Sequence, residues 1–168
     1  MKLSVLHQAA PSRRPHDGFT LIELMVIVSI IATLTVIAVP TLRAYTEKSR
    51  TARAIGDIRM IEKEIMSYYA DNFRFPASLD NIGRSDFLDP WGTPYQYLRI
   101  EPGKGKKGTG VLVSQARKDR FLVPINSDYD LYSMGPDRKT NLPLTSKTGR
   151  DDIIRANNGA FVGPAHLF

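Results

Sequence analysis

The sequence predicts an α/β protein of the α+β type, in which one long N-terminal helix packs on a small antiparallel sheet followed by a C-terminal loop region. An apolar run extends from Phe19 to Val39, and a one-sided apolar repeat follows over residues 55–69. Short strand-like stretches, separated by turns rich in glycine and proline, fill most of the remainder. The 168 residues suffice for one modest domain.

The apolar run has the length and composition of a membrane-spanning helix. About 20 apolar residues cross the hydrocarbon of a bilayer, and residues 19–39 meet that requirement. Arg13 and Arg14 lie just before the run, so the positive-inside rule places residues 1–18 in the cytoplasm. An ordinary secretory signal has the opposite order, because its short apolar core precedes the cleavage site.

A single carboxylate, Glu23, lies within this run, where a membrane helix ordinarily carries no charge. It is the only ionisable side chain between Thr20 and Leu42. A charged side chain at the bilayer centre costs about 2.5–3.5 kcal/mol on insertion scales. A carboxylate kept at that cost indicates a functional role for Glu23.

The segment Gly18-Phe19-Thr20-Leu21-Ile22-Glu23, with a basic leader before it and an apolar helix after it, resembles the type III signal of type IV pilins and pseudopilins. The resemblance implies that a prepilin peptidase cleaves between Gly18 and Phe19 and methylates the new amine of Phe19. Residues 1–18 are then the leader peptide, and residues 19–40 form the transmembrane helix of a filament core. A plain signal anchor without processing is the alternative interpretation.

The resemblance also assigns roles to Glu23 and Pro40. In the family, the carboxylate at this position pairs with the N-terminal amine of a neighbouring subunit. Two opposite charges in a medium of low dielectric need one another, so the pair would fix the axial register between subunits. Pro40 stands at the family position of a helix-bending proline, which lacks an N–H and clashes with the carbonyl four residues earlier, so we expect a kink there.

After the membrane run, the pattern predicts that the helix continues as an amphipathic one. Apolar side chains recur at spacings of three and four residues from Ile55 to Tyr69. Asn72 and the Phe75-Pro76 pair indicate the end of this helix, at about residue 72. Residues 41–168 are then a periplasmic globular domain. A sustained coiled coil is the alternative, which the short stripe disfavours.

The segment Asp89-Pro90-Trp91-Gly92-Thr93-Pro94-Tyr95-Gln96-Tyr97 combines two turn signals with the start of a predicted strand, Tyr95–Ile100. Trp91 is the only tryptophan, and we expect it to pack on the apolar stripe of the helix. The segment is similar to a hallmark of the major pseudopilins of type II secretion systems. This resemblance implies the pilin-like fold.

The remaining elements follow from local patterns. Residues 121–123 and 130–134 are predicted strands, joined by a turn at 124–128. Residues 101–120 are rich in glycine and lysine, and we expect a flexible, basic hairpin loop there. Residues 151–159 read as a short helix, because they begin with two acids and end with glycine.

The C-terminal loop carries a further resemblance. Residues 130–137 resemble the strand and turn that open the calcium-binding loop of major pseudopilins. The resemblance implies a Ca²⁺ ion held by the side chains of Asp137, Asp151 and Asp152 and by backbone carbonyls near Ser133 and Met134. Ca²⁺ prefers six to eight such oxygen ligands at about 2.3–2.6 Å. Because the chain has no cysteine, no disulfide can cross-link this loop, and a metal ion is the remaining way to cross-link it. Alternatively, Asp151 caps the predicted helix.

No pattern in the sequence predicts an enzyme. His7 and His16 lie in the leader and His166 stands alone near the C-terminus, without a nucleophile motif or zinc spacing. The net charge of +6 is modest and indicates a solvated surface, so no nucleic-acid partner is expected.

Together these resemblances imply a major pseudopilin that polymerises into the periplasmic pseudopilus of a type II secretion system and drives export of folded proteins across the outer membrane. The implied partners are further copies of the chain, minor pseudopilins, a prepilin peptidase, and an inner-membrane assembly platform with a cytoplasmic ATPase. The implied location is the bacterial inner membrane, crossed once, with the N-terminus cytoplasmic. The alternatives are a subunit of a surface type IV pilus, which usually carries a C-terminal disulfide, and a bitopic membrane protein with a basic periplasmic binding module.

Overall fold

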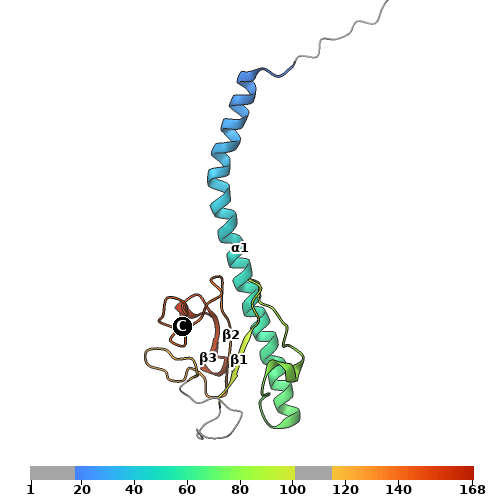
Figure 1. The fold of residues 1–168 in the computed structure, drawn as a ribbon, viewed down its shortest axis with the longest axis vertical. Helices are drawn as coiled ribbons and strands as arrows, with labels where there is room; N and C mark the ends of the chain where they lie inside the picture. The colour runs from blue at the N-terminus through green and yellow to red at the C-terminus, as the bar shows by residue number, and fades with distance from the viewer. Residues whose placement is uncertain (1–17, 101–114) are drawn as a thin grey trace, which may run out of the picture. The chain divides into compact units, whose positions relative to one another are not determined.

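The computed structural model describes residues 18–100 and 115–168. Two sequence predictions lie outside these residues, namely the leader up to residue 17 and the part of the basic hairpin loop over residues 101–114. The elements are α1 (Leu21–Asn72), η1 (Leu79–Ile82), β1 (Gln96–Arg99), β2 (Tyr129–Ser133), β3 (Ile153–Ala156), η3 (Asn157–Gly159), β4 (Phe161–Pro164) and η4 (Ala165–Leu167). This combination of one long helix and a sheet confirms the α+β class (Figure 1).

The helix α1 joins the apolar run and the amphipathic stripe without a break. The hydroxyls of Ser29, Thr33 and Thr35 donate hydrogen bonds to carbonyls four residues earlier, at 2.7–2.8 Å, so these polar side chains are satisfied by their own helix. By its length and composition, α1 could cross a membrane. Pro40 lies inside α1, and the kink there stays a prediction.

The chain divides into two compact units between Leu42 and Arg43. In the second unit, the amphipathic part of α1 presents one fully buried stripe formed by Ala54, Ile58, Ile61 and Ile65. The predicted helix end is confirmed, because α1 stops at Asn72, whose side-chain amide donates to the Tyr68 carbonyl at 2.9 Å. Such a side-chain bond satisfies one of the carbonyls that a helix end leaves without a partner.

The sheet of the second unit has the strand order β1-β2-β3-β4, and every neighbouring pair is antiparallel. Tyr97 faces Leu131 across the first pair, and Ile154 lies between Tyr132 and Gly163 in the centre of the sheet. Figure 1 shows β1 beside the C-terminal part of α1, followed by β2 and β3. The predicted strands at 95–100 and 130–134 are therefore confirmed as β1 and β2.

The core of the second unit lies between the α1 stripe and the sheet. A first cluster joins the stripe to Trp91, Tyr95, Tyr129, Leu131 and Ile153. A second cluster, on the far side of the sheet, contains Ile125, Leu144, Ile154, Ala156 and Ala165. Trp91 is only 6% exposed and belongs to the first cluster, so the prediction that it packs on the helix stripe is confirmed.

Two predicted elements are wrong. Residues 121–123 form no strand, and Phe121 is 92% exposed, because these three apolar residues face solvent instead of pairing with β2. Residues 151–159 form no helix, since Ile153–Ala156 is strand β3 and only Asn157–Gly159 adopts 3₁₀ geometry. Asp151 consequently caps no helix. The β-branched pair at 153–154 is fully buried between β2 and β4, and this burial outweighs the helix signals at both ends.

Candidate assembly and metal-binding sites

The N-terminus of α1 contains a reciprocal capping box. The Thr20 backbone N–H and hydroxyl both donate to Glu23 Oε2, at 2.9 and 2.8 Å, and the Glu23 N–H donates to Thr20 Oγ1 at 3.3 Å. The spacing Thr-x-x-Glu is the sequence signature of this motif, so the signal was present in the sequence. Within a single chain, the backbone N–H and the hydroxyl of Thr20 therefore hold the Glu23 carboxylate at the start of the helix.

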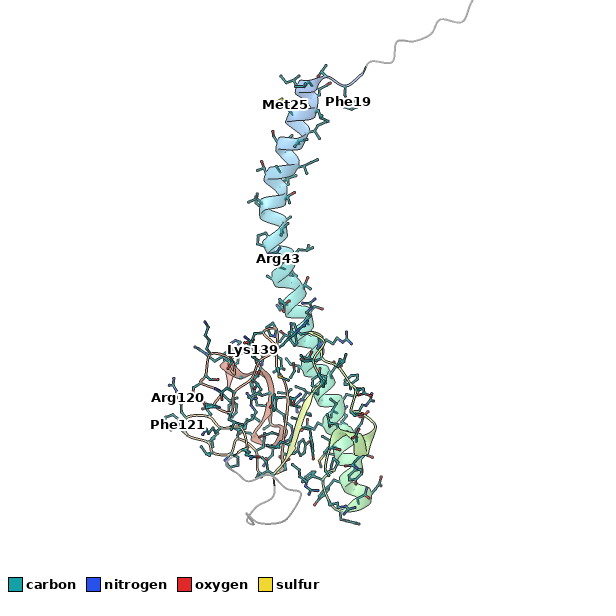
Figure 2. The ribbon with its side chains drawn as sticks, in the orientation of Figure 1. Phe19, Met25, Arg43, Arg120, Phe121 and Lys139 are labelled. Atoms are coloured by element: carbon teal, nitrogen blue, oxygen red, sulfur yellow. The ribbon has the colours of Figure 1, made fainter. Side chains whose placement is uncertain are left out.

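The apolar part of α1 is covered by none of the residues that the structure describes. Its large side chains are exposed all round the helix; Phe19 is 82% exposed and Met25 61%. Figure 2 shows these side chains standing out from the ribbon. An exposed apolar surface of this length requires a bilayer or other helices to cover it.

Asp89 organises the turn that carries Trp91. The carboxylate is 4% exposed and accepts four hydrogen bonds, from the N–H groups of Trp91 and Thr93 at 3.0 and 2.9 Å and from the hydroxyls of Thr93 and Ser133 at 2.6 Å each. Gly92 has a φ of +85°, a conformation that favours glycine. The structure thus explains why the Asp-Pro-Trp-Gly segment has aspartate and glycine at positions 89 and 92.

Two polar contacts attach this turn to α1. The Trp91 indole N–H donates to Glu47 Oε2 at 2.9 Å, and the Tyr95 hydroxyl donates to Asp57 Oδ2 at 3.0 Å. Both acceptors lie on α1 beside the buried stripe. Burial and the negative charge of Asp57 raise the pKa of Tyr95, which keeps its hydroxyl protonated as a donor.

Arg155 on β3 connects the sheet to α1 through buried ionic contacts. Its guanidinium donates to Glu62 Oε1 at 2.9 Å and to both carboxylate oxygens of Asp128, at 2.9 and 2.7 Å, and it lies 4.0 Å from the centre of the Tyr129 ring. The Arg155 side chain is 2% exposed. Burial opposes the charge of Arg155, but the hydrogen bonds that its guanidinium donates to the two carboxylates outweigh burial and raise its pKa, so the charge is permanent.

The predicted calcium loop brings Asp137 and Asp151 together. The Asp137 N–H donates to Asp151 Oδ2 at 3.4 Å, while Asp151 Oδ1 is buried and has no hydrogen-bond partner among the described residues. Gly135 has a φ of +65°, and a Cβ there would clash with the main chain of Asp151, so glycine permits this close approach. Burial, and secondarily the charge of Asp137, raise the pKa of Asp151.

Asp152 is part of a different contact. Its Oδ2 forms a fully buried ion pair with Nη2 of Arg117 and accepts a hydrogen bond from the Thr140 hydroxyl at 2.7 Å. Burial raises the pKa of Asp152 to about 6, against the lowering effect of Arg117 and Thr140. Sequence reasoning missed Arg117 as its partner.

The residues present fit a metal ion only in part. Within residues 18–100 and 115–168, no three His, Cys, Asp or Glu side chains are grouped as a metal site would require. The Asp137 main chain contacts the Asp151 carboxylate, and Asp151 has one buried oxygen without a partner among the described residues, which suits a cation. Asp152 is already neutralised by Arg117, so the structure does not gather the three predicted side chains into one site.

Comparison with known proteins supports the N-terminal assignment first. Residues 13–39 match the family model described as the prokaryotic N-terminal methylation motif. This range contains Gly18, Phe19 and Glu23, and it begins at Arg13, before the start of the described residues. No solved structure matches the chain.

Curated relatives extend the likeness to most of the chain. The type II secretion system core protein G of Pseudomonas aeruginosa is 31% identical over 76% of this chain and 88% of its own length. The protein of the same name from Escherichia coli K12 is 31% identical over 71% of this chain and 81% of its own length, and that from Dickeya chrysanthemi is 30% identical over 56% and 74%. With this identity over most of both chains, the protein belongs to the family of type II secretion system core protein G, the major pseudopilins of the type IV pilin superfamily.

Proposed function

We propose that this chain polymerises into the periplasmic pseudopilus of a type II secretion system and drives the export of folded proteins across the outer membrane. The observation that carries the proposal is the uncovered apolar surface of α1 with Glu23 at its start. Packed side by side in a filament, such helices would bury this surface against one another. The role is structural rather than enzymatic, in keeping with the names of the relatives.

Maturation and membrane placement form the second part of the proposal. A prepilin peptidase cleaves between Gly18 and Phe19 and methylates Phe19, which the match to the N-terminal methylation motif supports. Before assembly, the chain crosses the inner membrane once, with its N-terminus in the cytoplasm and the second unit in the periplasm. Minor pseudopilins and an inner-membrane assembly platform with a cytoplasmic ATPase are the further partners.

A calcium ion is a separate part of the proposal. Asp137 and Asp151 would hold it together with backbone carbonyls near Ser133 and Met134, and the ion would neutralise two carboxylates whose charges act on one another. Calorimetry on the purified full chain in detergent should show saturable heat with Ca²⁺ and a higher melting temperature. Asp151→Asn should abolish both effects, whereas exposed Asp86→Asn should keep them. Absence of heat and of any rise in melting temperature in millimolar Ca²⁺ would exclude the site.

Deletion of the gene tests the main proposal. We expect exported proteins to accumulate in the periplasm while surface pili remain, and the wild-type gene should restore secretion. A variant with Gly18→Ala should fail to restore it and should keep its leader, which mass spectrometry of the N-terminus detects. Normal secretion together with loss of surface filaments would instead identify a type IV pilin. Normal secretion with an uncleaved N-terminus in the wild type would favour the bitopic membrane protein.

A further inference from the structure

A buried arginine, Arg117, lies at the centre of the C-terminal loop region. Its side chain is 2% exposed, and that of its ion-pair partner Asp152 is 0% exposed. Nη1 donates to the Thr140 hydroxyl at 2.7 Å, and the guanidinium lies 4.1 Å from the centre of the Tyr132 ring. These contacts come from strand β2, which carries Tyr132, and from both Thr140 and Asp152 of the loop between β2 and β3, residues 134–152.

The backbone beside Arg117 is attached to the same two regions. The Arg117 N–H donates to the buried Asp130 carboxylate of β2 at 2.7 Å. On the loop side, the Lys118 N–H donates to the Leu142 carbonyl at 3.2 Å, and the Leu144 N–H donates to the Lys118 carbonyl at 2.9 Å. Arg117 therefore joins the loop to the sheet through its side chain and through its main chain.

The contacts around Arg117 resemble what a bound cation would provide. Buried carboxylates need a partner of opposite charge, and a metal ion or a basic side chain can supply it. The guanidinium does so with a charge that is not lost in proteins, and it adds directed hydrogen bonds to two groups at once. Unlike a metal ion, it cannot dissociate.

We infer that the Arg117 guanidinium is the permanent counter-charge of Asp152 in this loop. It keeps residues 140–152 folded on the sheet whether or not a metal ion is bound. A calcium ion at Asp137 and Asp151, if bound as proposed above, would then act only on the turn at residues 134–137 and on Asp151. The inference is independent of the calcium proposal, because it rests on the Arg117 contacts alone.

Hydrogen–deuterium exchange of the purified full chain in detergent, followed by mass spectrometry, tests this role. In the wild type, peptides covering 140–150 should exchange at the same rate in Ca²⁺ and in EGTA. Arg117→Gln should speed their exchange by at least about tenfold in both buffers, because it leaves Asp152 buried without a counter-charge. The control Arg150→Gln removes an equal charge from an exposed position of the same loop and should leave the rate unchanged.

Peptides from η1 and β1 serve as an internal reference for global unfolding. If Arg117→Gln unfolds the whole unit, Thr140→Val provides the second test, because it removes the hydroxyl contacts with Arg117 and Asp152 but keeps the ion pair between them, and it should speed exchange at 140–150 by about fivefold. Two results would overturn the inference. One is faster exchange of these peptides in EGTA than in Ca²⁺ in the wild type, which would show that a metal ion keeps the loop folded. The other is wild-type protection in both Arg117→Gln and Thr140→Val.

Discussion

At the scale of single residues, the charge of Glu23 can be separated from its capping role. Glu23→Gln keeps the Thr-x-x-Gln form of the capping box and removes the charge, whereas Thr20→Ala removes the hydroxyl contacts and keeps the charge. If the charge pairs with the neighbouring amine, Glu23→Gln and Glu23→Ala should reach the membrane normally but reduce filament yield by at least about tenfold, since breaking a buried ion pair costs several kcal/mol.

Thr20→Ala should assemble close to the wild-type level. The measurement is the ratio of filament to membrane-bound subunit, by shearing and immunoblotting of an overproducing strain. Wild-type assembly of Glu23→Gln combined with failure of Thr20→Ala would assign Glu23 to helix capping and remove it from the subunit contact.

Asp89 offers a second test at this scale. Asp89→Ala leaves four donors without their acceptor, so the free energy of unfolding should fall by about 3 kcal/mol. Exposed Asp86→Ala, three residues earlier, should change it by less than about 0.5 kcal/mol. Urea unfolding of the full chain in detergent measures both. Equal effects of the two substitutions would contradict the role of Asp89 as organiser of the turn.

Residue-scale prediction from the sequence succeeded where the signal was local. Trp91 was assigned to the helix stripe from its uniqueness and its turn context. The partner of Asp152 could not be inferred, because Arg117 lies 35 positions away and only folding brings the two together. The adjacent acids at 151–152 fit a metal site and a helix start equally well. Neither interpretation predicts a buried arginine as the partner of Asp152.

At the scale of elements, Arg155 provides the ionic link between β3 and α1. Arg155→Met keeps most of the apolar stem but leaves Asp128 without the guanidinium and Glu62 with Arg59 as its remaining cation, so the unfolding free energy should fall by about 3–5 kcal/mol. Exposed Arg53→Met on α1 is the matched control, with an effect below about 1 kcal/mol. In a double mutant, Glu62→Gln should recover part of the loss. Simple additivity of the two substitutions would show that Glu62 and Arg155 are not coupled.

The predicted elements differ in how much tertiary context they require. The amphipathic part of α1 was predicted with its end, because its stripe and its stop signals lie within the same stretch of chain. Strand β3 was mistaken for a helix, since its identity depends on pairing with β2 and β4 rather than on its own flanks. The exposed run at 121–123 was mistaken for a strand, because alternation and apolarity alone cannot show that a partner strand is absent.

At the scale of the whole molecule, the two units bury their apolar surface in different ways. The second unit covers the α1 stripe with its own sheet, while the apolar part of α1 stays exposed to solvent among the described residues and, in the proposed function, is covered by lipid or by other subunits. The stability of the second unit can therefore be measured without filament formation. Its core contains Tyr95 and Tyr129, with the partly buried Tyr97 packed against them, and we expect these tyrosines to make the unit sensitive to alkaline pH.

Burial raises the pKa of all three tyrosines above the ordinary value of about 10. Above that pH the unfolded chain loses these protons while the folded chain keeps them, so the stability they contribute is present below pH 10 and is lost as the pH rises further. Circular dichroism of the full chain in detergent should show a melting temperature that falls steadily above pH 10. A titration followed by phenolate absorbance should show these three of the seven tyrosines ionising only on unfolding.

Tyr129→Phe is the decisive variant, because the Tyr129 hydroxyl is buried and has no hydrogen-bond partner among the described residues. Removing this hydroxyl should raise the free energy of unfolding at pH 7 by about 1–2 kcal/mol, since the folded chain no longer buries an unpaired polar group. It should also reduce the fall in melting temperature above pH 10, because one titrating group is gone. Tyr97→Phe should instead lower stability at pH 7, since the Tyr97 hydroxyl donates to the Pro76 carbonyl at 2.8 Å. A loss of stability in Tyr129→Phe at pH 7, with an unchanged alkaline profile, would show that this hydroxyl has a partner in the folded protein.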